Sequence, residues 1–167
     1  MAGRIEARLS ELGIALPEPA APLADYVPWV RTGNLLFVSG QVPVGPDGLV
    51  KGQLSAADHA AGSPPAPAEG SEIARACDAA RLCGLALIAH AKAAADGDLD
   101  RIARVVKLVG FVNGAGDFEQ APVVINACSS LMGQVFGDAG RHARSAVTVA
   151  NLPFGVMVEV EAVFEIA

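Results

Sequence analysis

An arginine and a glutamate lie fifteen residues apart in the most strand-like part of the chain. Arg144 comes just before the apolar run Ser145–Val149, and Glu159 lies in the alternating run that follows. A guanidinium binds a carboxylate through two parallel hydrogen bonds, and a carboxylate can take a proton from water. The pair therefore suits an anionic substrate that reacts with water.

The same two residues also have a purely structural interpretation. An arginine at a strand start and a glutamate on an alternating strand are most often solvated or paired with each other. The sequence predicts a C-terminal hairpin, and if Ala150 faces Val156 in it, Arg144 and Glu159 point to opposite faces of the sheet. A shift by one residue, or a bulge, puts them on the same face. The residues alone leave both alternatives open.

Several other chemical signatures are absent from the sequence. There is no GxxxxGK phosphate loop and no GxSxG turn, so a phosphate-loop nucleotide site and a serine-hydrolase triad lack an anchor. The three histidines are His59, His90 and His142, and they have no metal-ligand spacing with the cysteines. We therefore expect no metal site.

The composition limits the classes of partner. The formal net charge is −6, and the 12 lysines and arginines are scattered, so we expect no nucleic-acid partner. The longest apolar stretch, 82–95, is interrupted by polar residues and is shorter than the ~20 residues of a membrane span, so we expect no membrane partner. The N-terminus has no apolar export segment, and three cysteines without a CxxC pair indicate buried thiols. Together these features favour a cytoplasmic protein.

The elements that must position Arg144 and Glu159 follow from hydrophobic periodicity. We expect a short N-terminal helix, a proline-rich linker over 17–22 and a surface loop over 59–70. Further along, the patterns predict strands at 26–30 and 35–38, a helix at 71–95 capped by Ser71, a strand at 102–112, a helix at 118–135, and strands at 145–149 and 156–166. This order predicts an α+β fold in one domain, with an antiparallel or mixed sheet and helices on one face.

The last strand alternates in character. Its apolar residues Val158, Val160, Ala162 and Phe164 are expected on one face. Met157, Glu159, Glu161 and Glu165 are expected on the other. Such a row of carboxylates must meet water, a partner subunit or a ligand.

Two blocks of the sequence resemble the Rid family, also called YjgF-like or L-PSP endoribonuclease-like. The first block is Tyr26–Pro43, with Gly33-Asn34 and Val38-Ser-Gly-Gln-Val-Pro43. The second is Leu99–Ile166, and its most specific parts are Ala143-Arg-Ser-Ala-Val147, Leu152-Pro153 and Val158-Glu-Val-Glu161. Together the blocks cover about half of the chain, so the resemblance is a basis for expectations about fold and site.

The resemblance implies a chorismate-mutase-like subunit, a mixed sheet backed by two helices, assembled as a homotrimer with ligand clefts between subunits. It implies hydrolysis of reactive enamines and imines to 2-keto acids and ammonia, with no cofactor. Arg144 would hold the carboxylate of this small-molecule substrate, and Glu159 would be the catalytic residue linked to the attacking water. The other substrate-binding residues that it implies are Ser39, Gly40, Tyr26 and Asn126.

Some features depart from the family pattern and mark a divergent branch. Ala146 stands where active members often carry a cysteine, and the segment 117–136 is longer than usual. The extension over about 1–22 and the Pro/Ala-rich loop over about 57–70 have no counterpart in the pattern. Two other functions therefore stay open. One is non-catalytic binding of a small carboxylate in the same cleft, in a regulatory role, and the other, ranked last, is the ribonuclease of the older family label.

Overall fold

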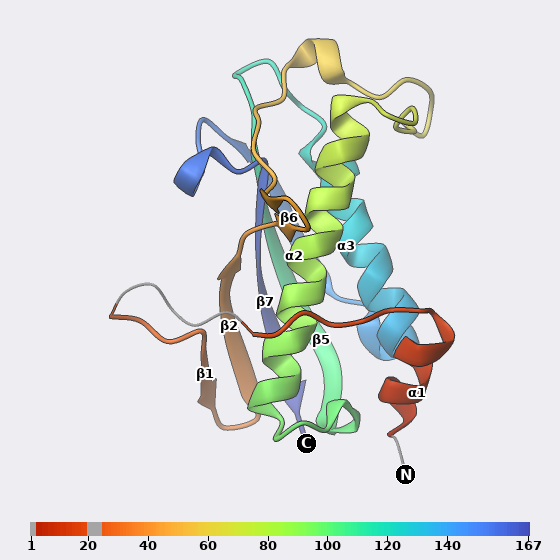
Figure 1. Cartoon of the computed structure of the whole chain (residues 1–167), viewed down its shortest axis with the longest axis vertical. Helices are drawn as coiled ribbons and strands as arrows, with labels where there is room; N and C mark the ends of the chain where they lie inside the picture. Colours follow the sequence, from red (N-terminus) through yellow and green to blue (C-terminus); the bar gives the residue numbers. More distant parts are fainter. Residues whose placement is uncertain (1–2, 20–24) are drawn as a thin grey trace.

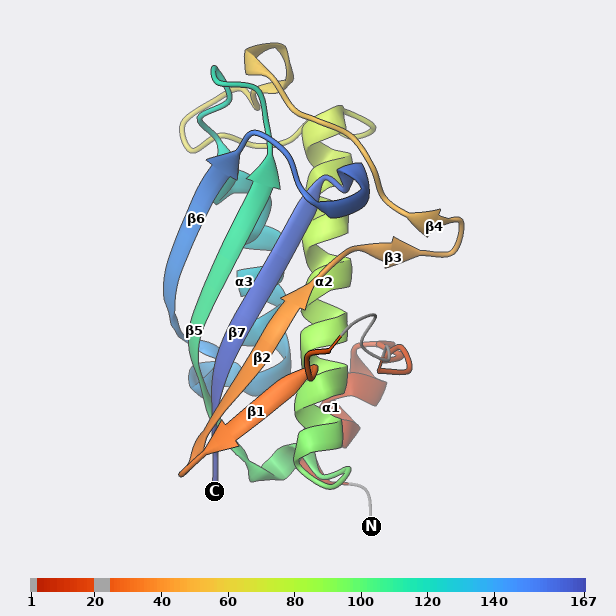
Figure 2. The same ribbon diagram turned by 90° about the vertical axis from the view of Figure 1, so that its left-hand side faces the viewer.

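A five-stranded sheet with two long helices on one of its faces forms the body of the computed structural model, which describes residues 3–19 and 25–167 (Figures 1 and 2). The strands lie in the order β1-β2-β7-β5-β6. Their bounds are β1 Trp29–Thr32, β2 Leu35–Gln41, β5 Ile102–Asn113, β6 Ala143–Val149 and β7 Val158–Ile166. β6 runs parallel to β5, and the other neighbours are antiparallel, so the sheet is mixed. The expected α+β class is confirmed.

The helices begin and end where local chemistry sets their ends. α2 (Glu72–Ala94) starts after Ser71, whose hydroxyl oxygen accepts a hydrogen bond from the Ala74 amide at 3.3 Å, as the capping prediction required. α3 (Ala121–Phe136) carries a proline in its first turn and ends at Gly137 with φ +61°. The short α1 (Arg4–Glu11) and a small hairpin of β3 (Val44–Gly45) and β4 (Gly48–Leu49) complete the regular elements.

The core lies between β7 and the two long helices. Val158, Val160, Ala162 and Phe164 of β7 are all buried on the helix side, as their alternation predicts. Gly84 of α2 allows a close approach to α3, because a Cβ at this position would lie 2.9 Å from Leu131 and 3.0 Å from the Cys128 sulfur. The three cysteines are free, and Cys83 and Cys128 are fully buried while Cys77 is half-buried.

The opposite face of the sheet, called the open face below, is not covered by any helix of the described chain (Figure 2). Val30, Phe37 and Val147 on this face are 53%, 45% and 44% exposed. Glu159 and Glu161 of β7 lie on the same face. An apolar surface with a carboxylate row is therefore open to solvent in the isolated chain.

The predicted C-terminal hairpin is wrong. β6 and β7 are not neighbours, because β5 lies between them and pairs with both. The connection that leaves β6 therefore crosses over the end of β5 before β7 begins. Met157, expected beside the glutamates, is buried, because β7 starts only at Val158 and the Met157 backbone pairs with Val50 and Asn113 instead.

Two other expectations concern the N-terminal part. The first strand starts at Trp29 rather than at Tyr26, because Pro28 has no amide hydrogen to give to the ladder. Part of the expected extension and linker lies outside the described residues, namely positions 1–2 and 20–22. The rest of the linker, positions 17–19, contains no helix or strand, as expected of a linker. None of the helices in the described ranges combines the length and the apolarity that crossing a membrane requires.

Candidate functional site

Arg144 lies on β6 and turns toward α3. It is in register with Leu108 of β5, which is fully buried, so the Arg144 side chain leaves the sheet on the helix side. Its Nη1 donates to Asn126 Oδ1 at 2.8 Å and to Ser129 Oγ at 3.1 Å. The guanidinium has five N–H donors, so the rest of the fork remains available to a carboxylate. Two predicted substrate-binding residues, Arg144 and Asn126, are thus brought together.

Ser129 and His142 extend this cluster, and sequence reasoning missed both. His142 Nδ1 is 2.6 Å from the Gly140 carbonyl oxygen, which can only accept, so Nδ1 carries the hydrogen. In the neutral ring Nε2 then accepts from the Ser129 hydroxyl at 3.1 Å, and the Ser129 oxygen accepts from Arg144. The spacing of Asn126 and Ser129, three residues apart on one helix, was a signal that could have revealed the shared face.

Glu159 lies on the open face of β7, against the backbone of β2. The ladder between β2 and β7 shifts between Val38 and Gln41, and Gly40 sits in this irregular stretch. A Cβ at Gly40 would overlap Glu159 Oε1 and would lie 2.9 Å from its Cδ, so glycine leaves room for the carboxylate in its present position. Burial raises the pKa of Glu159, and the Glu161 carboxylate raises it further. A carboxylate with a raised pKa is a stronger base for water than an ordinary one.

Ser39 and Tyr26 belong to the same neighbourhood as Glu159. The Ser39 hydroxyl donates to the Val27 carbonyl at 2.9 Å, and the Ser39 amide donates to the Pro28 carbonyl at 3.0 Å. These bonds fasten the segment that carries Tyr26 against β2. Tyr26 is 52% exposed and lines a pocket together with Gly40. In the isolated chain, Ser39 therefore holds backbone in place.

The six predicted site residues form two groups on opposite faces of the sheet. Arg144 is in register with Leu108, and Leu108 with Ala162, both on the helix side. Glu159 is in register with Phe111 on the open face. The direct pairing of Arg144 with Glu159 that the structural interpretation allowed is therefore wrong. Within one chain the two groups do not form a single site.

Metal-ligating side chains do not cluster in the described part of the chain. Within residues 3–19 and 25–167, no three or more His, Cys, Asp or Glu side chains are grouped so that they could hold a metal ion. The chemistry that this geometry offers is that of a guanidinium, a half-buried carboxylate and backbone groups.

Comparisons with known proteins point to one family. Residues 6–166 match the family described as "YjgF/chorismate_mutase-like, putative endoribonuclease". The chain is 45% identical over 168 residues to Protein TCP17 of Trypanosoma cruzi, and the match covers 98% of this chain and 95% of TCP17. The solved structure of Atu1372 from Agrobacterium tumefaciens, a protein of unknown function, is 42% identical with a TM-score of 0.80, over 98% of this chain and 92% of that one. The structure of Escherichia coli TdcF with bound serine is 25% identical with a TM-score of 0.56, over 91% and 98% of the two chains.

Proposed function

We propose, because this chain belongs to the YjgF/chorismate-mutase-like family, that it hydrolyses reactive enamines and imines derived from amino acids to 2-keto acids and ammonia, without a cofactor. The observation that carries this proposal is the arrangement of its two charged groups. Arg144 is oriented by α3 and keeps donors for an anion, while Glu159 is half-buried with a raised pKa. One group suits binding of a carboxylate, and the other suits proton transfer from water.

In this proposal Arg144 holds the substrate carboxylate. Asn126 and Ser129 occupy Nη1, so they fix the plane of the guanidinium without neutralising its charge. The serine bound to TdcF carries an amino-acid carboxylate, which agrees with a small carboxylate as the ligand of this chain as well. The substrate class is therefore a small 2-imino acid or its enamine form.

Glu159 acts on the attacking water. The carbon of the imine is already electrophilic, so positioning and one proton relay suffice. The oxygen of water forms a bond to the imine carbon, and Glu159 takes one proton of the water and passes it to the imine nitrogen. The C–N bond of the resulting carbinolamine then breaks as the hydroxyl proton moves to the nitrogen through Glu159. The nitrogen leaves as ammonia, and the carbonyl of the 2-keto acid remains.

The complete site lies between two chains in this proposal. Arg144 and Glu159 are on opposite faces of one sheet, so they can meet at one substrate only if different subunits supply them. The partly apolar open face, with Val30, Phe37 and Val147, is a surface that a second copy would cover. We propose a cytoplasmic homotrimer, with a mass of about 51 kDa from three chains of 17.0 kDa. Light scattering that gives a 17.0 kDa particle at micromolar concentration would contradict it.

The activity is tested by generating 2-aminoacrylate, or an imine of another amino acid, in the presence of the pure protein. We expect release of pyruvate, or of the matching 2-keto acid, and ammonia faster than in buffer. The absence of acceleration across substrates with small, branched and aromatic side chains would overturn the proposal. The matched control is Glu161→Gln, which changes the same residue type on the same face two residues away.

A mixing experiment tests whether two chains share the site. Each variant alone, Arg144→Ala or Glu159→Gln, is expected to be inactive. The two variants are then mixed at equal concentration, unfolded together and refolded. If neighbouring subunits supply the two groups, about a quarter of the sites receive one intact copy of each. Activity near a quarter of the wild-type value is then expected. Activity that stays at the level of the separate variants would show that the two groups are not combined across an interface.

A second candidate is a non-catalytic protein that binds a small carboxylate in the same cleft. Ala146 favours it, because a cysteine common in active relatives of the Rid family is missing beside Arg144. This candidate predicts saturable binding of a 2-keto acid by calorimetry, together with no turnover in the imine assay. A ribonuclease is disfavoured by the net charge of −6, because phosphate binding needs a basic surface.

A further inference from the structure

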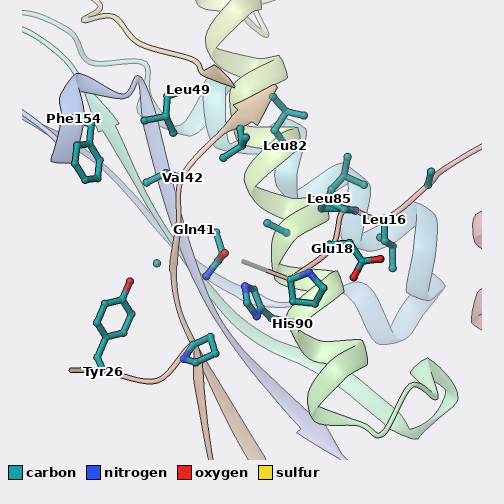
Figure 3. A pocket seen from close by; sticks show the side chains of 17 residues that line it. Leu16, Glu18, Tyr26, Gln41, Val42, Leu49, Leu82, Leu85, His90 and Phe154 are labelled. Atoms are coloured by element: carbon teal, nitrogen blue, oxygen red, sulfur yellow. The ribbon is translucent and has the colours of Figure 1, made fainter. Parts of the chain in front are cut away.

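The pocket that Tyr26 and Gly40 line extends between β2, α2 and the N-terminal segment 15–19 (Figure 3). Its volume is about 730 Å³, within the range of small-molecule pockets. Tyr26 and Gly40 belong to its lining, but its wall on α2 is formed by residues with no part in the proposed hydrolysis site, Leu82, Leu85, Ala86 and His90.

The lining of the cavity is mostly apolar. Leu16, Val42 and Leu49 contribute aliphatic side chains from three different segments, in addition to the leucines of α2. The charged side chain in the lining is Glu18, a carboxylate. A ligand that fits this surface is therefore largely apolar, and a negative charge on it would be repelled by Glu18.

His90 gives the cavity a polar point. His90 is only 2% exposed, and neither ring nitrogen has a hydrogen-bond partner among the described residues. Nδ1 is sealed from solvent, so Nε2 is the nitrogen that a molecule in the cavity can reach. Burial lowers the pKa of His90, so the ring is neutral near pH 7. Nε2 of His90 is therefore a polar group without a protein partner on an otherwise mostly apolar wall, and a ligand hydroxyl can supply that partner.

Gln41 supplies a second polar group on the adjoining wall. Its amide nitrogen donates to the Ser39 carbonyl at 2.9 Å, and this bond fixes the side chain. The amide oxygen has no partner among the described residues and so can accept from a ligand. In the view of Figure 3, Gln41 and His90 lie between Tyr26 on one side and Leu85 and Glu18 on the other.

We propose that this cavity is a second ligand site, for a small, uncharged, mostly apolar molecule with one hydroxyl group that hydrogen-bonds to His90. The site shares Tyr26 and Gly40 with the proposed hydrolysis site, but its α2 wall and His90 have no role in that reaction. The amide oxygen of Gln41 can accept a hydrogen bond from a ligand hydroxyl, the His90 ring can donate one to it, and the aliphatic walls cover the remainder of the molecule. A tightly packed core histidine would leave no such space beside the ring.

The test uses benzyl alcohol, toluene and benzoate as probes of the full chain, with binding followed by ligand-observed NMR and by the imidazole nitrogen shifts of His90. We expect saturable binding of benzyl alcohol, binding of toluene weaker by roughly two- to tenfold for the loss of one hydrogen bond, and the weakest binding for benzoate. His90→Phe keeps a ring but removes both nitrogens, so it should reduce benzyl alcohol to the level of toluene.

Filling the cavity is the second arm of the test. Ala86→Phe on α2 places a ring in the cavity and should abolish binding of all three probes, and Leu85→Trp does the same if the first variant folds poorly. Ala93→Phe is the matched control, because Ala93 is exposed on the same helix and lies outside the lining. Binding that is absent in the wild type, or that Ala86→Phe and Ala93→Phe affect equally, overturns the site. Arg144→Ala should leave benzyl alcohol binding intact, so failure of this site and failure of the proposed hydrolysis are distinguishable.

Discussion

Two regions of the molecule carry one charged group each, and the fold treats the two groups in opposite ways. At the edge formed by α3 and β6, Arg144 remains exposed and is hydrogen-bonded by Asn126 and Ser129. On the open face, Glu159 is half-buried and has no hydrogen-bond partner among the described residues. It is positioned by the shape of the backbone at Gly40.

The difference shows how one sheet can prepare two kinds of chemistry. Hydrogen bonds from neutral groups fix the direction of the guanidinium while water still stabilises its charge, which suits binding of an anion. Loss of water around the Glu159 carboxylate raises its pKa, which makes the ionised group a stronger base for proton transfer from water. Variants in the two regions should therefore change different kinetic constants.

The largest expected effect is that of Glu159→Gln on turnover. The amide keeps the shape of the side chain but cannot take a proton, so kcat should fall by roughly 10² to 10⁴. Calorimetric binding of the 2-keto acid product should persist, because Arg144 is unchanged. Steady-state kinetics with a generated imine provide the measurement.

Glu161→Gln tests whether this effect belongs to Glu159 or to the carboxylate row. Glu161 lies on the same face of β7 but is exposed, so we expect kcat to change less than about twofold. Equal losses for the two variants, or no loss for either, would mean that the row is a solvated or interface surface and that the catalytic assignment is wrong.

Gly40→Ala should disturb Glu159 without removing it. The new Cβ would overlap Oε1, which is the mobile end of a side chain, so the carboxylate can move aside and the fold should survive. A displacement of about 1 Å in a catalytic group can lower turnover by about 10². We expect a kcat loss of this size with a small change in the urea midpoint. Unchanged kcat would show that the position of the carboxylate against β2 does not matter.

Arg144→Lys should act on binding. An ammonium keeps the charge but cannot form the planar fork, and the loss of a charged hydrogen bond is about 1.5 to 3 kcal/mol. If Arg144 holds the carboxylate equally in the ground and transition states, KM should rise roughly tenfold to a hundredfold with kcat little changed. Inhibition by a 2-keto acid should weaken by the same factor. A loss confined to kcat would place Arg144 in the chemical step instead.

Local patterns predicted most elements of the fold. The alternation of β7 and the Ser71 cap of α2 are properties of neighbouring residues, and both predictions were confirmed. The hairpin prediction failed because strand order is a non-local property. A short connection after β6 is compatible with pairing to β7, but β6 pairs with β5, which separates it from β7.

The candidate site was predictable as a set of residues but not as a geometry. The family resemblance gave Arg144 and Asn126, which do lie within hydrogen-bond distance. Ser129 was missed because its three-residue spacing from Asn126 was not used, and His142 was missed because its spacing matches no metal or catalytic motif. The separation of Arg144 from Glu159 depends on how β5 is aligned with β6 and β7. The alternation of side chains along β6 and β7 alone could not predict that alignment.

The smallest effect concerns the dependence of stability on pH. The folded-state pKa of Glu159 is raised above its ordinary value of 4.5, first by burial and then by Glu161. Between the ordinary and the raised value, the folded state binds more protons than the unfolded state, so the free energy of unfolding falls as pH rises through this interval. Glu159→Gln cannot ionise and should remove this fall. The variant should then be more stable than the wild type above the interval and equal to it below 4.5.

Glu161→Gln should reduce the fall, because it removes the second cause of the shift. Urea unfolding at fixed protein concentration, compared at about pH 4 and pH 7 for the three chains, measures these differences. A fall of equal size in the wild type and in Glu159→Gln would mean that Glu159 is no more buried than Glu161, and the contrast between the two regions would be lost.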